Sequence, residues 1–402
     1  MSTTITINTY KELQNFRDNV NNGTNTAKTV KLGADIDMNG DDWTPIGYYY
    51  SQNNQKYYSG TFDGQGYVIK NMKIDIIKTK TSSGQNLYNG LFSNINGTIQ
   101  NVTLINPIIY SSSDQYDYMN FYVSFLCGYQ QATGESIKNC KIINGHIDLD
   151  NKSTNKNYIK IGCICSYVSS QSSCIISNCF VEVELNIKNS IVFMFGGIAY
   201  INSSLNRCGV QISGIVDMNL KIMPSSSNFC GLTYLSSTSV ISNCYVINNL
   251  KYGIKETNIS LLHNWIMGVG YSGSSSAKIS NTYTINNIDL TVAMNNVSYH
   301  TYCYAISNNA TCSNCYSINN VILRKFASNN YVYFNANNTN LTTTFNISIA
   351  QDSQYTSYSL YKSNATTSTT LEDDLLSGKI CYLLNNNSSS NVNFYQLSLI
   401  HI

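Results

Sequence analysis

A four-residue pattern recurs along this chain: an apolar residue, any residue, Asn and then Cys. It is clearest at Ile137–Cys140, Ile176–Cys179 and Ile241–Cys244. Counting the weaker copies, the Asn position falls at residues 71, 101, 139, 178, 207, 243, 281 and 314, so the spacing runs from 29 to 39 residues. A period of about 20 to 50 residues is typical of solenoids, propellers and arrays. The repeat therefore constrains the fold more than any other feature of the sequence.

Each period shows two recognisable short strands. One is apolar and rich in small residues, as in Gly196–Ala199, and the other starts at the Asn-Cys pattern, as in Cys244–Val246. A propeller needs four strands in each period, so two strands favour a parallel β-helix. The chain holds 32 Tyr and 24 Gly but only 3 Pro, which suits strands and turns and argues against a helical array. We expect an all-β fold, a single right-handed parallel β-helix solenoid.

Short helices are expected to cap both ends of this solenoid. Thr9–Glu12 is a capping box, and Leu13, Phe16 and Val20 follow at helical spacing. A second candidate helix begins near Thr370. Such caps cover the open ends of a repeat core.

The chain then divides into four segments. Residues 1–45 form the N-terminal capping helix and first strand, residues 46–345 the β-helix repeats, and residues 346–396 an irregular C-terminal segment with its capping helix. Residues 397–402 resemble the translation of a transposase adapter used in sequencing libraries, so we interpret them as an artefact. The natural protein is expected to continue beyond Gln396.

Side-chain alternation in the second strand assigns three sets of residues, because successive residues of a strand point to opposite faces. The inward set is a core ladder of thiols, namely Cys140, Cys179, Cys208, Cys244 and Cys315. The Asn residues of the pattern are predicted to form a turn ladder of stacked amides, namely Asn71, Asn101, Asn139, Asn178, Asn243, Asn281 and Asn314. Arg207 interrupts this amide ladder, where we expect an irregularity. The outward aromatic set is Phe180, Tyr245, Tyr283 and Tyr316.

Several classes of site are disfavoured by composition. Only 11% of residues are charged and the net charge is +2, so we expect no nucleic-acid partner. Cys312 and Cys315 form a Cys-x-x-Cys pattern without a second pair, and the chain holds only four His, so we predict no metal site and no cofactor. The start has no signal-peptide pattern, and no apolar run is long enough to span a bilayer. We expect a monomer.

Taken together, these motifs resemble a known family of repeat proteins. The segments Trp43–Gly47 and Phe62–Gly66, the Gly-Gly-Ile and Ile-x-Asn-Cys-Tyr strands and the closing segment Leu376–Asn385 are similar to those of GLUG-motif proteins. The resemblance spans nearly all of residues 5–396. It implies a pectin-lyase-like right-handed β-helix, secreted or displayed at the cell surface, with an adhesion-like role.

Three functions remain open from the sequence. The first is a non-enzymatic adhesion or binding module whose outward aromatic rings contact a glycan or a protein; those rings could equally serve only to stabilise neighbouring coils. The second is a polysaccharide lyase or glycoside hydrolase, for which Asp114 with Asp117, Asp148 with Asp150 and Glu182 with Glu184 are the candidate carboxylate pairs. The third is a coat or filament component, which capped ends would oppose.

Overall fold

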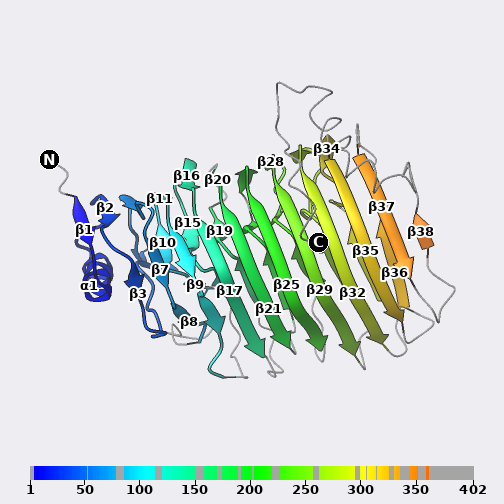
Figure 1. Ribbon diagram of the computed structural model, residues 1–402, viewed down its shortest axis with the longest axis horizontal. Coiled ribbons are helices and arrows are strands. Elements are labelled where there is room, and N and C mark those ends of the chain that lie inside the picture. Colours follow the sequence, from blue (N-terminus) through cyan, green and yellow to red (C-terminus); the bar gives the residue numbers. More distant parts are fainter. Residues whose placement is uncertain are drawn as a thin grey trace.

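The computed structural model is a parallel β-solenoid, and its described residues include one short helix, at the N-terminal end (Figure 1). It describes residues 4–361 except 52, 78–85, 114–119, 151–157, 170–173, 189–191, 202, 220–225, 257–261, 295–298, 305, 314, 326–329, 336–343 and 352–358. The second candidate helix, the adapter-like segment, Asn314, Asp114 and Asp117 lie outside the described residues.

Two sheets meet at the Asn-Cys pattern. Sheet 1 contains β1 (Ile5–Ile7), β2 (Val30–Leu32), β6 (Thr61–Asp63), β11 (Thr98–Gln100), β16 (Gly134–Lys138), β20 (Cys174–Ser177), β24 (Ser204–Asn206), β28 (Val240–Ser242), β31 (Lys278–Ser280) and β34 (Thr311–Ser313). The long sheet contains β3 (Ile36–Asp37), β7 (Val68–Lys70), β8 (Lys73–Asp75), β12 (Thr103–Ile105), β13 (Ile108–Tyr110), β17 (Lys141–Asp150), β21 (Phe180–Lys188), β25 (Gly209–Asn219), β29 (Tyr245–Glu256), β32 (Tyr283–Met294), β35 (Cys315–Lys325) and β37 (Thr344–Gln351).

Two further sheets complete each coil. Sheet 3 contains β9 (Asn86–Asn89), β14 (Asn120–Val123), β18 (Tyr158–Gly162), β22 (Val192–Gly196), β26 (Ser226–Cys230), β30 (Leu262–Met267), β33 (Tyr299–Tyr304), β36 (Asn330–Asn335) and β38 (Ser359–Tyr361). Sheet 4 contains β10 (Phe92–Ile95), β15 (Cys127–Gln130), β19 (Cys165–Val168), β23 (Ala199–Ile201) and β27 (Thr233–Tyr234). A separate antiparallel hairpin joins β4 (Tyr48–Ser51) to β5 (Asn54–Lys56).

One coil of the solenoid passes through four strands, in the order β18, β19, β20 and β21. The expectation of two strands in each period was therefore wrong. The apolar segment taken as one strand is a bend of two residues between sheets 3 and 4, such as Cys163–Ile164 between β18 and β19. These strands have only a few residues and break at the bends, so alternation along the sequence does not separate them. The pairing from coil to coil is parallel, as between Phe180 and Gly209, and its register shifts within the pairings of β16 with β20, β17 with β21 and β23 with β27.

The described part of the core runs from Ile7 to Cys315 and is covered at its N-terminal end by α1 (Tyr10–Asn21). The predicted capping box is present, with the Glu12 N–H donating to Thr9 Oγ1 at 3.2 Å and the Thr9 N–H donating to Glu12 Oε2 at 3.1 Å. Leu13, Phe16 and Val20 are buried against the first coils, and the Phe16 ring meets the Tyr58 ring edge-on at 5.4 Å. The sequence prediction of an N-terminal capping helix is confirmed.

Candidate functional site

The Asn of the repeated pattern sits at the sharp bend between sheet 1 and the long sheet. Its backbone is left-handed in the described copies at this bend, with φ of 55° at Asn139 and 48° at Asn281. Asn is several-fold enriched in this conformation among residues with a side chain. The recurrence of Asn in the sequence therefore has a backbone cause in addition to any side-chain role. The prediction was wrong for Asn71, which lies one bend later, between β7 and β8 of the long sheet. Lys70 pairs with Ile105, so Asn71 is the equivalent of Asn106, and residues 64–67 form the bend after β6.

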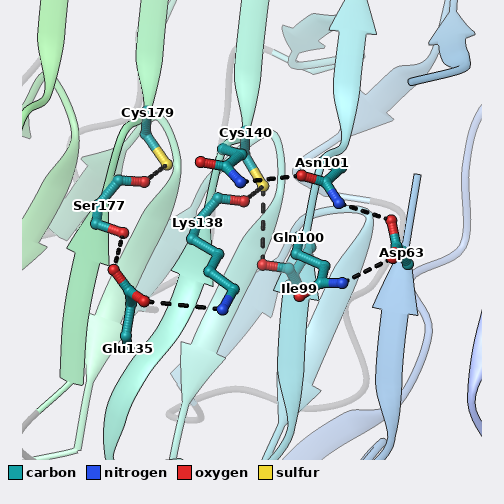
Figure 2. Close-up of polar contacts among 10 residues, drawn as sticks. Asp63, Ile99, Gln100, Asn101, Glu135, Lys138, Cys140, Ser177 and Cys179 are labelled. Carbon is teal, nitrogen blue, oxygen red and sulfur yellow. Dashed lines mark hydrogen bonds and ion pairs between the residues drawn. The ribbon is translucent and has the colours of Figure 1, made fainter. Parts of the chain in front are cut away.

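The Asn side chains also form hydrogen bonds along the solenoid axis, as Figure 2 shows for Asn101 and its neighbours. Asn139 Nδ2 donates to Asn101 Oδ1 at 3.0 Å, and Asn101 Nδ2 donates to Asp63 Oδ1 at 2.9 Å. Asn281 Nδ2 donates to Asn243 Oδ1 at 3.2 Å. One run of amides thus begins on the carboxylate of Asp63 and extends to Asn139, and a second joins Asn243 and Asn281. Asn71 is outside both runs, because its Nδ2 donates to Asp37 Oδ1 at 2.9 Å.

Arg207 keeps the left-handed bend, with φ of 55°, but it changes the ladder. Asn243 Nδ2 donates at 3.1 Å to Asn206, the residue before Arg207, instead of to position 207 itself. The Arg207 side chain is exposed. The irregularity expected at this coil is therefore a shift of the acceptor by one residue, with no change of the bend.

The thiols of the pattern lie in the core. The side chains of Cys140, Cys179, Cys208, Cys244 and Cys315 are all almost fully buried. Each thiol donates to the carbonyl oxygen two residues earlier, as Cys244 does to Ser242 at 3.1 Å. Thr282 occupies the same place in the next coil and its hydroxyl makes the equivalent bond to Ser280 at 2.9 Å. Burial raises the pKa of Cys179 and Cys244, so these thiols are poor nucleophiles.

The outward aromatic residues form one row across the long sheet. Tyr245 and Tyr283 stack face to face, with ring centroids 5.5 Å apart and an angle of 11° between planes. Gly209 separates Phe180 from Tyr245 in the register, and a Cβ atom there would lie 2.3 Å from the Tyr245 ring. Tyr316 continues the row by backbone pairing with Tyr283, and its side chain is outside the description. Because Tyr245 and Tyr283 cover one another, they present edges more than faces to a ligand.

Beside this aromatic row, the outer face of the long sheet is hollowed by three adjoining cavities. Their volumes are about 490, 390 and 520 Å³. The first two share Gly214 and Ile215, and the last two share Asn249 and Asn287. We call the joined cavities the long-sheet groove. It crosses the strands β17, β21, β25, β29 and β32, and four strand spacings of about 4.8 Å give it a length of roughly 19 Å.

Three kinds of side chain line the long-sheet groove. The polar neutral ones are Asn186, Gln211, Ser213, Asn249 and Asn287; the ionisable ones are His146, Asp148, Glu182, Glu184, Lys251 and Asp289; the exposed apolar ones include Ile215. Asn287 Nδ2 donates to Asn249 Oδ1 at 2.7 Å, and Asn186 Nδ2 donates to Asp148 Oδ1 at 2.9 Å. These bonds orient the amides and leave further donors and acceptors facing the groove.

Two of the three candidate carboxylate pairs, Asp148 with Asp150 and Glu182 with Glu184, lie on the long sheet. Glu182 and Glu184 point outward from β21 and Asp148 points outward from β17. His146 Nδ1 lies 3.3 Å from Glu184 Oε2, and the two side chains are 37% and 59% exposed. This exposure leaves both groups in contact with water, which weakens their interaction. Within the described residues, no group of three or more His, Cys, Asp or Glu side chains is placed to hold a metal ion.

The sequence indicated the aromatic row and the carboxylates but missed the groove between them. Its polar lining comes from Gln211, Ser213, Asn249 and Asn287, which are ordinary strand residues when each coil is considered alone. Only their register places them together, as in the pairing of Ser213 with Asn249 and of Asn249 with Asn287. Gly214 at the groove floor, with φ of 113°, was the one sequence signal, since a Gly inside a strand marks a special backbone.

Comparisons with known proteins assign neither a family nor an activity to the chain. No protein family model matches the chain, so the resemblance to GLUG-motif proteins is supported only as far as a β-helix. No curated protein matches either. A solved structure of a putative immunoglobulin A1 protease from Bacteroides ovatus is 18% identical, with a TM-score of 0.42 over 97% of this chain and 91% of that one. Likewise, no helix among the described residues is long and apolar enough to cross a membrane. The chain is thus a parallel β-solenoid whose family and activity are not assigned by its relatives.

Proposed function

We propose that this protein is a binding module that holds an extended neutral glycan in the long-sheet groove. The observation that carries the proposal is the groove itself, three joined cavities on one rigid face. A length of roughly 19 Å suits a chain-like ligand better than a small molecule. The role is adhesion-like, as in the GLUG-motif proteins that the sequence resembles, and we place it at the cell surface on the same resemblance.

The chemistry of the lining supports a sugar ligand. Hydroxyl-rich ligands need many donors and acceptors, and the groove supplies amides at Asn249, Asn287 and Gln211 with a hydroxyl at Ser213. Ile215, which is 44% exposed, supplies an apolar surface for the carbon face of a sugar ring. The stacked rings of Tyr245 and Tyr283 border this lining and stiffen its edge.

Charge favours a neutral polymer over an acidic one. The groove is lined by four carboxylates, namely those of Asp148, Glu182, Glu184 and Asp289. The permanent cation in this lining is Lys251. A uronate polymer would bring its carboxylates against this excess of negative charge. The charge of the groove therefore speaks against the polysaccharide-lyase alternative for acidic substrates.

Glycan-array binding followed by titration calorimetry tests the proposal. Neutral glycans should bind, uronate polymers should bind more weakly, and Asn249→Ala and Ser213→Ala should each reduce affinity about fivefold or more, as expected for one lost hydrogen bond. Thr238→Ala is the matched control for Ser213→Ala, because Thr238 is exposed in a turn of another face. If Asn249→Ala and Ser213→Ala bind the glycan as tightly as Thr238→Ala does, the groove is not the binding site.

A glycoside hydrolase is the second candidate, because His146 lies 3.3 Å from Glu184 in the same groove as Asp148. A reducing-end assay on each bound glycan separates the two functions. Turnover that is abolished by Glu184→Gln would establish hydrolysis, whereas binding without turnover supports the binding module. A filament role is opposed by α1, which covers the N-terminal end of the core.

A further inference from the structure

A cluster of tyrosines lies outside the solenoid core, where sheets 3 and 4 meet. Its buried members are Tyr88, Tyr122 and Tyr200, and packed against them are Tyr49, Tyr129, Tyr167, Tyr234, Met194 and Ile201. Tyr122 points away from the core, since its neighbours Phe121 and Val123 point into it, yet it is only 7% exposed. The rings of the two sheets cover one another, with 5.0 Å between the Tyr88 and Tyr129 centroids and 5.2 Å between those of Tyr122 and Tyr167.

One lysine enters this aromatic cluster. Lys160 of β18 lies in register between Tyr122 of β14 and Met194 of β22. Lys160 Nζ donates to Tyr122 Oη at 2.8 Å and lies 4.4 Å from the centre of the Tyr122 ring and 6.0 Å from that of Tyr200. The lysine side chain is half-buried, so it keeps a path to solvent. Desolvation by apolar neighbours is one way in which proteins activate a lysine as a nucleophile.

Burial lowers the pKa of Lys160 to about 8. It raises the pKa of Tyr122 to about 12, with Tyr167 adding to the effect. Among the described residues, the titratable groups of the aromatic cluster around the amine include Tyr88 of β9, Tyr122 of β14, Tyr167 of β19 and Tyr200 of β23. At neutral pH the phenol therefore keeps its proton while a sizeable fraction of the amine, about one part in ten at pH 7, is neutral.

We propose that Lys160, with Tyr122 as its proton partner, is a covalent capture site for small aldehydes. The neutral amine nitrogen attacks the carbonyl carbon, and the Tyr122 hydroxyl protonates the carbonyl oxygen. The nitrogen then loses two protons. One restores the phenol of Tyr122, and the other goes to the former carbonyl oxygen. The carbonyl oxygen leaves as water and a C=N bond replaces the C=O bond, with no change of oxidation state.

Competitive labelling of the full chain tests this site. The protein is treated with limiting benzaldehyde and cyanoborohydride at pH 7, and peptide mass spectrometry reports the rate at each lysine. Three exposed strand lysines of the same protein serve as internal comparators in the same reaction, namely Lys31, Lys141 and Lys278. Lys160 should label about tenfold faster than they do, because far more of its amine is neutral. A Lys160 rate at or below the comparator rates overturns the proposal.

Two further measurements separate chemistry from simple accessibility. The Lys160 labelling rate should rise with pH to a plateau with a midpoint near 8, whereas the comparators should keep rising toward pH 10. Tyr122→Phe keeps the ring but removes the hydroxyl, so labelling of Lys160 should slow severalfold while the comparators stay unchanged. A Lys160 midpoint near 10, or an unchanged Lys160 rate in Tyr122→Phe, contradicts the assigned pair. This site lies on sheets 3 and 4, so its failure would leave the long-sheet groove untouched.

Discussion

At the scale of single residues, the repeated Asn performs two tasks that a sequence pattern alone cannot separate. It adopts a left-handed backbone that most residues avoid, and its side chain bonds to the next coil. Arg207 shows that the bend survives without the amide, because Asn206 takes over as the acceptor. At that coil the left-handed backbone is therefore kept, whereas the side chain that accepts the hydrogen bond can be replaced by its neighbour.

Substitutions at Asn139 should divide these two contributions. Asn139→Ala should lower the free energy of unfolding by about 1–3 kcal/mol, through left-handed strain and one lost amide bond. Asn139→Gly should lower it by less, since glycine accepts positive φ without strain. Urea denaturation of both variants gives the comparison. Equal losses in the two variants would mean that the hydrogen bond alone matters.

Asp63 should make stability depend on acid. Burial raises the pKa of Asp63, but hydrogen bonds from Asn101, the Gln65 N–H and Gln100 outweigh it, and the net pKa lies below the ordinary 3.8. A lowered folded-state pKa means that the stabilisation is present above that ordinary value and disappears as pH falls through the folded one. Unfolding curves from pH 6 to pH 2.5 should converge for the wild type and Asp63→Asn. Parallel curves would count against this role.

At the scale of elements, the long strands of the long sheet build the groove, and the short strands of the other sheets turn the chain. The sequence predicted the repeat, the solenoid, the capping helix and the inward thiols from periodicity alone. It could not predict four strands in each coil, because two-residue bends leave no gap in the apolar pattern. It could not predict the groove, because Gln211, Ser213 and Asn249 belong together only through a register between strands more than 30 residues apart.

Gly214 is the element-scale test of the groove floor. Its φ is 113°, and an added Cβ atom would lie 2.1 Å from the Leu185 carbonyl oxygen. Gly214→Ala should therefore destabilise the protein by roughly 1–3 kcal/mol and weaken glycan binding. Gly66→Ala is the control, because Gly66 has φ of 89° with nothing near its Cβ position. If Gly66→Ala lowers the free energy of unfolding as much as Gly214→Ala does, backbone strain explains the whole effect at Gly214 and the contact of the added Cβ atom does not.

The thiol ladder should accept a hydroxyl in place of a thiol. Thr282 already makes the bond to the carbonyl two residues earlier that Cys244 makes one coil before it. Cys244→Thr should therefore change the free energy of unfolding by less than about 1 kcal/mol, whereas Cys244→Ala should cost about 1–2 kcal/mol through a cavity and a lost bond. Thermal unfolding with Thr282→Cys as the reverse exchange completes the test. Equal stability of the Thr and Ala variants would show that the bond contributes nothing.

At the scale of the whole molecule, the solenoid is a stack in which each coil contacts mainly its neighbours, so damage at one end should stay local. Phe16→Ala removes an aromatic ring from the cap and should cost about 3–5 kcal/mol locally. Hydrogen exchange should accelerate in α1, β1 and β2 while β25 and β29 keep their protection. Light scattering should show association through the uncovered end. Asn15→Ala, on the exposed side of α1, is the control and should leave both measurements unchanged. Uniform acceleration along the chain would indicate a single cooperative unit.

The groove is assembled by stacking, and this sets how its reach can change. Each additional coil lengthens the face by about 4.8 Å and adds one residue to each row of the lining, as Asn287 does after Asn249. Duplication or loss of one repeat would then change the number of polymer units that the groove binds, without changing the kinds of contact that it makes. The number of repeats would then set the length of polymer that binds. Homologues with more or fewer repeats should select polymers of different length but of the same sugar composition.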